Sequence, residues 1–379
     1  MEAAVFRSAR SERRDVRGAL VSWFARLLSG GRAREAFEAG LDGPRERLNH
    51  SEVRGKRNFV RVWRNLLGRP GSVWRPALFL AGIALVAAIL SPAFLTVRNL
   101  LALLTSSSFL VVLAVGEAFV ILVGMIDLGV ESVLSAGGMF VAWLTVLHAV
   151  PWQVAVPAGL VAGGLVGFGV GALVSRGGIP SFIVTLGTYW GIRGVALLFN
   201  QGNYISPDSA SPARPLGFAW LAGTIHGVSV LILVTLAVVI LGQVLVSFTP
   251  LGRWIRGVGS NESAVRAVGL PSGRIKVLVF IVSGTLAALA GVMLTAWQQS
   301  IYPLSGEGDS LAAIAGVILG GIPFTGGRGT IVGAALGVLV IGVINDVIVL
   351  VGLPSLYQYI FVACILILAG LQARLAYAK

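Results

Sequence analysis

Long apolar runs, separated by short polar stretches, make up the chain from Pro76 onward. The runs are unbroken and lack the strict alternation of polar and apolar positions that is typical of a membrane strand. A helix needs about 17 to 25 apolar residues to cross the hydrocarbon core, and most of these runs are that long. Because a helix satisfies its own backbone hydrogen bonds in lipid, the pattern predicts an all-α, polytopic membrane protein.

About ten transmembrane helices are predicted, with boundaries that such a pattern gives only to within a few residues. The eighth run is short and rich in glycine, so we expect a re-entrant or broken helix there. The ten predicted spans are residues 76–95, 100–123, 131–148, 152–174, 179–200, 228–248, 277–297, 310–325, 329–352 and 355–371.

The composition agrees with a membrane protein, because 56% of the 379 residues are hydrophobic and only 12% are charged. A soluble domain of this size could not bury so much apolar surface. The 50 glycines suit helices that pack closely in lipid. We therefore expect one transmembrane domain over residues 76–371 and a short cytoplasmic tail over residues 372–379.

The basic charge of the chain is concentrated at its start. Residues 1–75 hold 17 Lys and Arg against 8 Asp and Glu, whereas the other residues hold 12 against 8. Residues 1–70 are predicted to be a basic N-terminal cytoplasmic extension, either disordered or containing an amphipathic surface helix over residues 16–28. A basic arm beside an anionic leaflet fits this charge better than a nucleic-acid-binding segment does, so no nucleic-acid partner is expected.

Basic residues also indicate the orientation of the chain in the membrane. If the N-terminus is inside, loop 249–276 is cytoplasmic, and it holds four Arg and one Lys. The outward loops 96–99 and 201–227 hold one Arg each, and the outward loop 298–309 holds none. The positive-inside rule therefore predicts that both termini are cytoplasmic and that the polar loops 201–227 and 298–309 face outside.

A compact charged stretch, "GSNESAVRAVGL" (residues 259–270), lies in the cytoplasmic loop between two apolar runs. Asn261 is a good helix N-cap, Glu262 follows at the positive end of the helix, and Gly269 suits its C-terminal end. Glu262 and Arg266 are four residues apart in the favourable order for an ion pair. The stretch predicts a short cytoplasmic helix of about two turns.

So short a helix is not stable alone in water, so something must hold it. Val265 and Val268 are expected to share one face of it. That face could bind the bilayer surface, or the helix could enter a groove on a soluble partner.

Four segments resemble, in order and spacing, motifs of bacterial ABC-transporter permeases of the ribose/monosaccharide type. The resemblance covers about residues 76–371 and leaves residues 1–70 outside it. The segments are "GMIDLGVESVLSAGG", "IPSFIVTLGTYWGIRGVALLFNQG", "GRWIRGVGSNESAVRAVGL" and "GEGDSLAAIAGVILGGIPFTGGRGTIVGAALG".

This resemblance implies the membrane subunit of a binding-protein-dependent importer in the bacterial cytoplasmic membrane, carrying a small polar solute, most simply a monosaccharide. Such permeases pair with a second permease protomer, identical or a close paralogue, and an extracytoplasmic solute-binding protein delivers the solute. A cytosolic ABC ATPase binds the short helix. The residues that match the family's coupling motif are Asn261, Glu262, Ala264, Arg266 and Gly269.

Enzymatic chemistry of the chain's own is not expected. A phosphate-binding loop needs Gly-Lys followed by Ser or Thr, and the only Gly-Lys pair, Gly55-Lys56, is followed by Arg. The three histidines and Cys364 form no metal-ligand pattern. No cofactor is therefore expected, and ATP would be bound by the partner subunit.

Acids inside the membrane are costly, so they usually face an interior. Asp127 and Glu131 are expected to share a helix face four residues apart, where like charges repel. The family pattern retains Asp127 but has Ser and Gly where this chain has Gly129 and Glu131. The candidates for lining a solute path are Glu117, Asp127, Glu131, Asn345 and Asp346.

The alternative for these acids is structural: they cap helices or pair with a neighbour such as Arg193. A second glycine-rich feature, residues 319–329, is predicted to be either the cytoplasmic turn between the eighth and ninth spans or a gate, with Arg328 as an inside anchor. Its candidate residues are Gly320, Gly321, Gly326 and Gly327.

Three other functions fit parts of the pattern. A related permease for branched-chain amino acids or nucleosides would share the architecture. An ion-coupled secondary transporter would work without an ATPase partner. A membrane-anchored scaffold would depend on the basic arm of residues 1–70.

Overall fold

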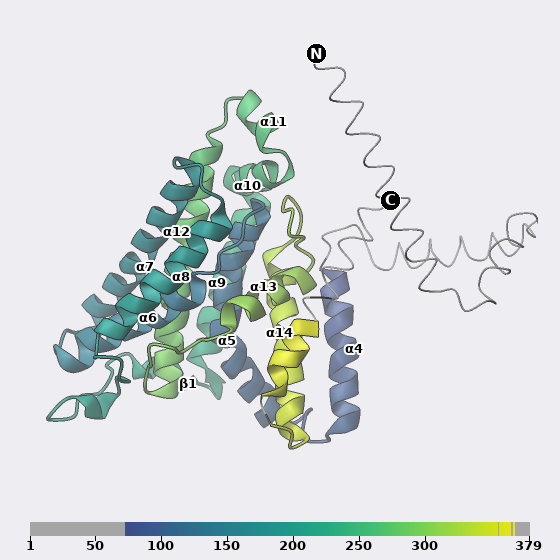
Figure 1. Ribbon diagram of the computed structural model, residues 1–379. Coiled ribbons are helices and arrows are strands. Elements are labelled where there is room, and N and C mark those ends of the chain that lie inside the picture. Colours follow the sequence, from purple (N-terminus) through teal and green to yellow (C-terminus); the bar gives the residue numbers. More distant parts are fainter. Residues whose placement is uncertain (1–72, 355, 365–366, 368–379) are drawn as a thin grey trace, which may run out of the picture. The chain divides into compact units, whose positions relative to one another are not determined.

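The computed structural model describes residues 73–354, 356–364 and 367 of the chain. The extension expected over residues 1–70 and the tail expected over residues 372–379 lie outside the described residues, as does the end of the last expected span. Within the described part, helices account for nearly all regular structure (Figure 1).

Seven helices among the described residues are long and apolar enough to cross a membrane. Each begins and ends within a few residues of an expected span, because the apolar run that lipid requires also sets the length of the helix. They are α5 (Val97–Leu122), α6 with its π-helical extension (Val130–Leu147), α7 (Trp152–Ser175), α8 (Ser181–Leu198), α9 (Val230–Phe248), α12 (Ser272–Gln298) and α14 (Ile331–Leu350).

Two further apolar helices are shorter. α4 (Trp74–Leu90) has 17 residues and α13 (Asp309–Leu319) has 11. At 1.5 Å per residue α13 is only about 16 Å long, roughly half the hydrocarbon thickness, so it does not cross the membrane by itself. A short helix was expected there. The count of ten spans is not confirmed, since α4 and α13 are shorter than the seven long helices of the described part and residues 357–364 give only part of the last expected span.

The most buried long helices of the described part are α5, α6 and α12. α12 packs against α5, α6 and α7. Most of the apolar window of α5 (78%) is buried, against 22% of that of α8, so α8 leaves most of its surface for lipid or another chain. Close approach requires glycine where α7 meets α12: a Cβ on Gly167 would collide with the carbonyl of Phe280.

The long loop between α8 and α9 holds the small exceptions to an all-α fold. It contains two 3-10 turns (Pro207–Ser209 and Ala219–Ala222) and a two-stranded antiparallel hairpin, β1 (Thr224–Ile225) and β2 (Val228–Ser229). Ile205 of this loop exchanges two backbone hydrogen bonds, of 2.8 and 3.0 Å, with Ile301. The bridge joins the two polar loops that were expected to face outside.

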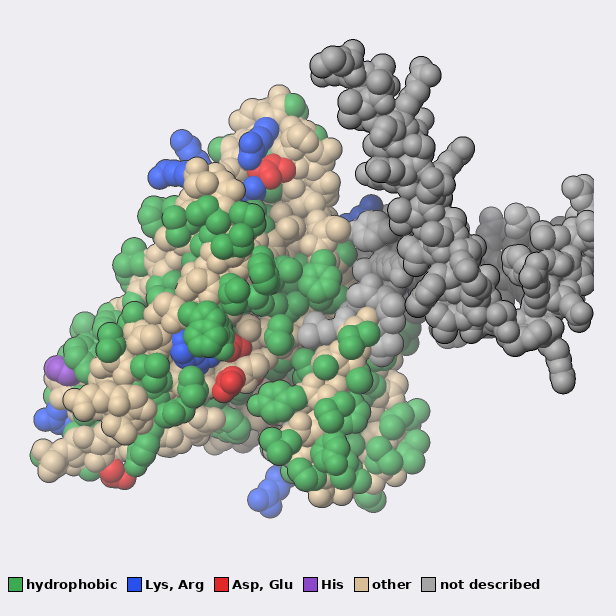
Figure 2. All heavy atoms as spheres, in the orientation of Figure 1, with side chains coloured by type: hydrophobic (Ala, Val, Ile, Leu, Met, Phe, Trp, Pro, Cys, Tyr) green, Lys and Arg blue, Asp and Glu red, His purple; other side chains and the backbone are tan. Residues whose placement is uncertain are grey.

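α10 (Pro250–Ser260) and α11 (Glu262–Ala267) lie at the opposite end of the helices from the β1 hairpin (Figure 1). On the face shown in Figure 2, blue and red side chains gather near the two ends and in one central group, and green side chains are spread over the surface between them. This distribution is typical of a membrane protein whose polar loops lie on either side of an apolar band.

Candidate functional site

The charged stretch forms the short helix that the sequence predicts. The side chain of Asn261 accepts a hydrogen bond from the backbone N–H of Ala264 (3.0 Å), which makes it the N-cap of α11. Gly269, with φ of +80°, ends the segment in a conformation that suits glycine. Because both signals act within a few residues, sequence reasoning could find them.

α11 is held by the chain itself, through contacts that sequence reasoning missed. Glu262 pairs with Arg266 at 2.7 Å, as expected, and also with Lys276 of α12 at 2.8 Å. The Nε of Arg266 donates to the hydroxyl of Ser272, at the start of α12 (2.9 Å). Burial opposes ionisation of Glu262, but hydrogen bonds from Lys276 and Arg266 outweigh it and lower its pKa to about 2.

The two valines of the segment do not share an environment. Val265 is buried, whereas Val268 is 74% exposed, because it follows the last residue of α11 and has left the helical conformation. The expectation of one shared face is therefore wrong. The exposed side of the segment includes Val268, the outward part of Arg266 and the small residues Ser263, Ala264 and Ala267.

Glu117 and Asp127 form one buried polar group. The carboxylate of Glu117, on α5, accepts from the backbone N–H of Asp127 (3.1 Å). Asp127 in turn accepts from the N–H of Gly129 (3.0 Å) and from the hydroxyl of Ser283 on α12 (3.2 Å). The second oxygen of Glu117 has no hydrogen-bond partner among the described residues. The group joins α5, the loop before α6 and α12.

Asp127 and Glu131 do not share a helix face, contrary to the expectation. α6 begins at Val130, so Asp127 lies in the preceding loop. The side chain of Asp127 bonds the backbone N–H two residues ahead, which competes with helix formation there. Asp127 therefore stabilises the loop before α6 without capping the helix, whose N-cap is Gly129, and Glu131 points into a different group.

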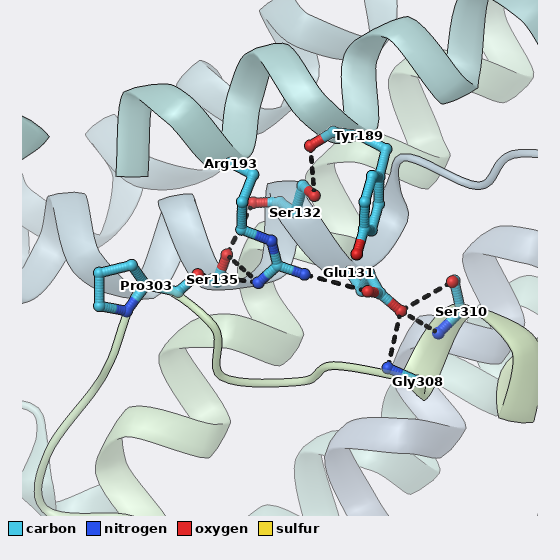
Figure 3. Close-up of polar contacts among 8 residues, drawn as sticks. All are labelled: Glu131, Ser132, Ser135, Tyr189, Arg193, Pro303, Gly308 and Ser310. Atoms are coloured by element: carbon cyan, nitrogen blue, oxygen red, sulfur yellow. Dashed lines mark hydrogen bonds and ion pairs between the residues drawn. The ribbon is translucent and has the colours of Figure 1, made fainter. Parts of the chain in front are cut away.

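Both carboxylate oxygens of Glu131 accept hydrogen bonds (Figure 3). One carboxylate oxygen pairs with Nη2 of Arg193, on α8, at 3.0 Å, and both side chains are nearly fully buried. The other oxygen accepts from the N–H of Gly308 (3.1 Å), the N–H of Ser310 (3.1 Å) and the hydroxyl of Ser310 (2.8 Å). This is the pairing with Arg193 that the structural alternative names.

Arg193 holds the same group from the other side (Figure 3). Its Nη1 donates to the carbonyl of Pro303 (2.8 Å) and to the hydroxyl of Ser135 (3.4 Å). Its guanidinium lies 5.3 Å from the centre of the Tyr189 ring, a cation–π distance. The Glu131–Arg193 pair thus ties α6 and α8 to the start of α13 and to the loop before it.

Asn345 and Asp346 lie apart from both groups. Asp346, on α14, accepts from the side-chain amide of Asn99 at the start of α5 (2.6 Å). The side-chain oxygen of Asn345 is buried and has no partner among the described residues. The five candidate path residues are therefore distributed over three separate groups.

The glycine-rich residues form the turn between α13 and α14. Gly320 caps α13, and Gly321 has φ of +91°. Gly326 and Gly327 also have positive φ, and the N–H of Gly327 donates to the carbonyl of Leu122 at the end of α5 (2.9 Å). These residues thus form a turn that touches α5, whereas its cytoplasmic side and the alternative of a gate stay predictions.

Comparison with known proteins shows clear relatives. Residues 99–370 match the family described as the permease component of branched-chain amino acid transport systems. The chain is 35% identical over 319 residues to the ribose import permease protein of Escherichia coli (strain K12), covering 84% of this chain and 97% of that protein.

Two further relatives are similar over most of their length. The ribose import permease protein of Bacillus subtilis (strain 168) is 37% identical over 301 residues, which are 79% of this chain and 92% of the relative. The L-arabinose ABC transporter permease protein of Azospirillum brasilense is 34% identical over 311 residues, 82% of this chain and 88% of the relative. No solved structure matches the chain.

Proposed function

The chain belongs to the family of permease components of branched-chain amino acid transport systems, and we propose that it is the membrane subunit of an ATP-driven importer for a monosaccharide. The observation that carries this proposal is the 35% identity to a ribose import permease over 97% of that protein's length. A second relative imports L-arabinose by its name. Sugar relatives that span nearly the whole domain favour a sugar over a branched-chain amino acid or a nucleoside.

ATP is hydrolysed, on this proposal, by a cytosolic ABC ATPase that docks on α11. Support comes from the way α11 is presented: it is capped by Asn261 and fastened to α12 through Lys276 and Ser272. A docking helix must keep a defined position and orientation for its partner, and these contacts hold α11 in place at the start of α12. Val268 and Arg266 are exposed for the partner to contact.

The solute path lies between this protomer and a second permease protomer, either identical or a close paralogue. The acids Glu131 and Glu117 are hydrogen-bonded to other groups of their own protomer. A path between two protomers leaves these bonds intact, which supports this position of the path. α8 leaves most of its apolar window unburied, which is surface that a second protomer can cover. A binding protein would deliver the solute at the end that carries loop 201–227, with both termini of the chain in the cytoplasm.

Uptake of labelled ribose, arabinose and allose tests the proposed function. Cells that lack their own sugar importers should express the chain with an ATPase and a binding protein taken from the same importer. We expect uptake to need all three components and to continue with an uncoupler while ATP is held constant. Uptake by the chain alone, or its collapse with the uncoupler, would instead indicate an ion-coupled secondary transporter.

Docking can be tested separately at Val268, the exposed residue at the end of α11. Val268→Asp should lower co-purification of the ATPase by about tenfold or more, because an unpaired charge would be buried at the contact. Val268→Ala removes apolar area without adding charge and serves as the control. Equal ATPase recovery with both variants would contradict docking through this end of α11.

The orientation can be tested with single cysteines in a Cys364→Ser background. Val268→Cys should react with a membrane-impermeant maleimide only in inside-out vesicles. Ala213→Cys, in the exposed loop at the other end, should react only in intact spheroplasts. The opposite result would place α11 outside and remove the ATPase from the proposal.

A further inference from the structure

Three stretches of backbone meet near the end of α10. The N–H of Gly327, in the turn between α13 and α14, donates to the carbonyl of Leu122 at the end of α5 (2.9 Å). A Cβ on Gly259, near the end of α10, would lie 2.6 Å from the nitrogen of Gly327 and would collide with the Leu122 carbonyl. A Cβ on Gly327 would collide with the side chain of Ser260. We name Leu122, Gly259, Ser260 and Gly327 together the glycine junction.

Other contacts tie the same elements together. The guanidinium of Arg256, on α10, donates to the carbonyl of Gly329 in the turn (3.2 Å). The side-chain oxygen of Gln243, on α9, accepts from the N–H of Val332 in the first turn of α14 (3.1 Å). α9 therefore contacts the start of α14, and α10 contacts the turn before it.

The junction lies close in sequence to two features described above. Gly259 precedes Glu262, the first residue of α11, by three positions, and Leu122 precedes Asp127 by five. Contacts between backbone atoms cannot yield by a change of rotamer, as contacts between long side chains can. A displacement of α11 must therefore push on the end of α5 and on the turn before α14, or break these contacts.

We infer that the glycine junction transmits the movement of α11 to α5 and α14, and that Gly259 and Gly327 are positioning residues for transport. The inference rests on the proposed function, in which an ATPase moves α11. Gly259 allows α10 to lie directly on the α5 carbonyl, and Gly327 allows the turn to lie on Ser260. A methyl group at Gly259 would separate α10 from α5 while leaving the exposed side of α11 unchanged.

The test compares Gly259→Ala with Gly257→Ala in the complete importer. Both substitutions add one methyl group to α10, but a Cβ at Gly257 meets only a side-chain methyl of Val265, at 3.2 Å. Gly259→Ala should retain ATPase co-purification and basal ATP hydrolysis. Sugar taken up per ATP hydrolysed should fall at least about tenfold, which corresponds to about 1.4 kcal/mol. Gly257→Ala should stay within about twofold of the parent, a difference below 0.5 kcal/mol.

Parental uptake per ATP in Gly259→Ala would overturn the inference, and so would an equal loss in both variants. Because Gly259→Ala could fail to insert in the membrane, hydrogen exchange of the unmodified complex gives a second test. Nucleotide-free complex is compared with complex trapped by ATP and vanadate. Exchange in residues 119–125 and 324–329 should change together with exchange in residues 259–268.

The same measurement distinguishes this inference from the proposed function. Suppose that the ATPase protects residues 262–268 and that their exchange changes on trapping, while exchange in residues 119–125 and 324–329 does not. The junction then does not transmit the movement of α11, and only the inference is overturned. If residues 262–268 are not protected by the ATPase at all, docking on α11 is wrong, and both the proposed function and the inference are overturned.

Discussion

The buried Glu131–Arg193 pair gives the sharpest prediction about stability. Glu131→Leu leaves the Arg193 charge without its carboxylate, and removing one partner of a buried pair costs about 3–5 kcal/mol. It also leaves the N–H groups of Gly308 and Ser310 without an acceptor, at about 1–3 kcal/mol for each group that water does not reach. We therefore expect Glu131→Leu to lower the free energy of unfolding by at least about 3 kcal/mol.

Arg193→Met should cost a similar amount for the complementary reason, since it leaves Glu131 charged and buried. The double variant removes both charges, so its cost should be smaller than the sum of the two single costs by about 2–3 kcal/mol. Reversible unfolding by SDS in mixed micelles, followed by far-UV circular dichroism, measures all three. The control is Glu307→Gln, in the loop before α13, where the side chain is exposed. It should change the free energy of unfolding by no more than about 0.5 kcal/mol.

Additive costs in the double variant would refute the reasoning, because they would show that the two side chains do not stabilise each other. Single variants with parental stability would refute it as well. The double variant also bears on the solute path. If Glu131 is structural, as its four hydrogen bonds indicate, the double variant should show the parental KM for uptake, even where the amount of folded protein is lower.

Three further predictions concern α11. Lys276→Ala should increase hydrogen exchange in residues 262–268, whereas Arg274→Ala, at an exposed position of the same helix, should not. Asn261→Ala should destabilise the helix by about 1 kcal/mol and Asn261→Ser by much less, measured by the same exchange. The pKa of Glu262 is lowered from 4.5 to about 2. The stability that its ion pairs give to α11 is therefore fully present above about pH 5 and is lost as the pH falls toward 2. The anisotropy of a fluorophore on Val268→Cys, in the Cys364→Ser background, should stay constant from pH 8 to 5 and fall below pH 4; a fall near pH 6 would contradict the lowered pKa.

The spans and the caps could be predicted from the sequence because their causes are local. The apolar run that becomes α7 was placed at residues 152–174, and the helix covers Trp152–Ser175. Lipid requires an unbroken apolar stretch with internal hydrogen bonds, so the stretch and the helix coincide. The cap at Asn261 depends on a backbone N–H three residues away, which the order of residues already specifies.

Contacts between distant residues could not be predicted in this way. Arg193 and Glu131 are 62 positions apart, and Lys276 is 14 positions from Glu262. Arg193 was named as a neighbour that such acids could reach, but nothing in the sequence distinguished Glu131 from Asp127 as its partner. The start of α6 decides this, and it depends on Asp127 turning its side chain onto Gly129 and Ser283 instead of joining the helix.

α11 is connected to the membrane helices by two routes of different stiffness. Toward α12 the connection is made by the side chains of Lys276 and Ser272, through one ion pair to Glu262 and one hydrogen bond from Arg266. Toward α5 and α14 the connection is the close packing of the end of α10 on the backbone of Leu122 and Gly327, together with the hydrogen bond from Arg256 to the carbonyl of Gly329. Side-chain contacts can stretch and re-form when α11 changes position. The backbone contacts of the glycine junction cannot, so its residues either move together or lose their packing. If the ATPase displaces α11, exchange in the turn before α14 and at the end of α5 should therefore change more than exchange in α12, which a comparison of trapped and nucleotide-free complexes measures.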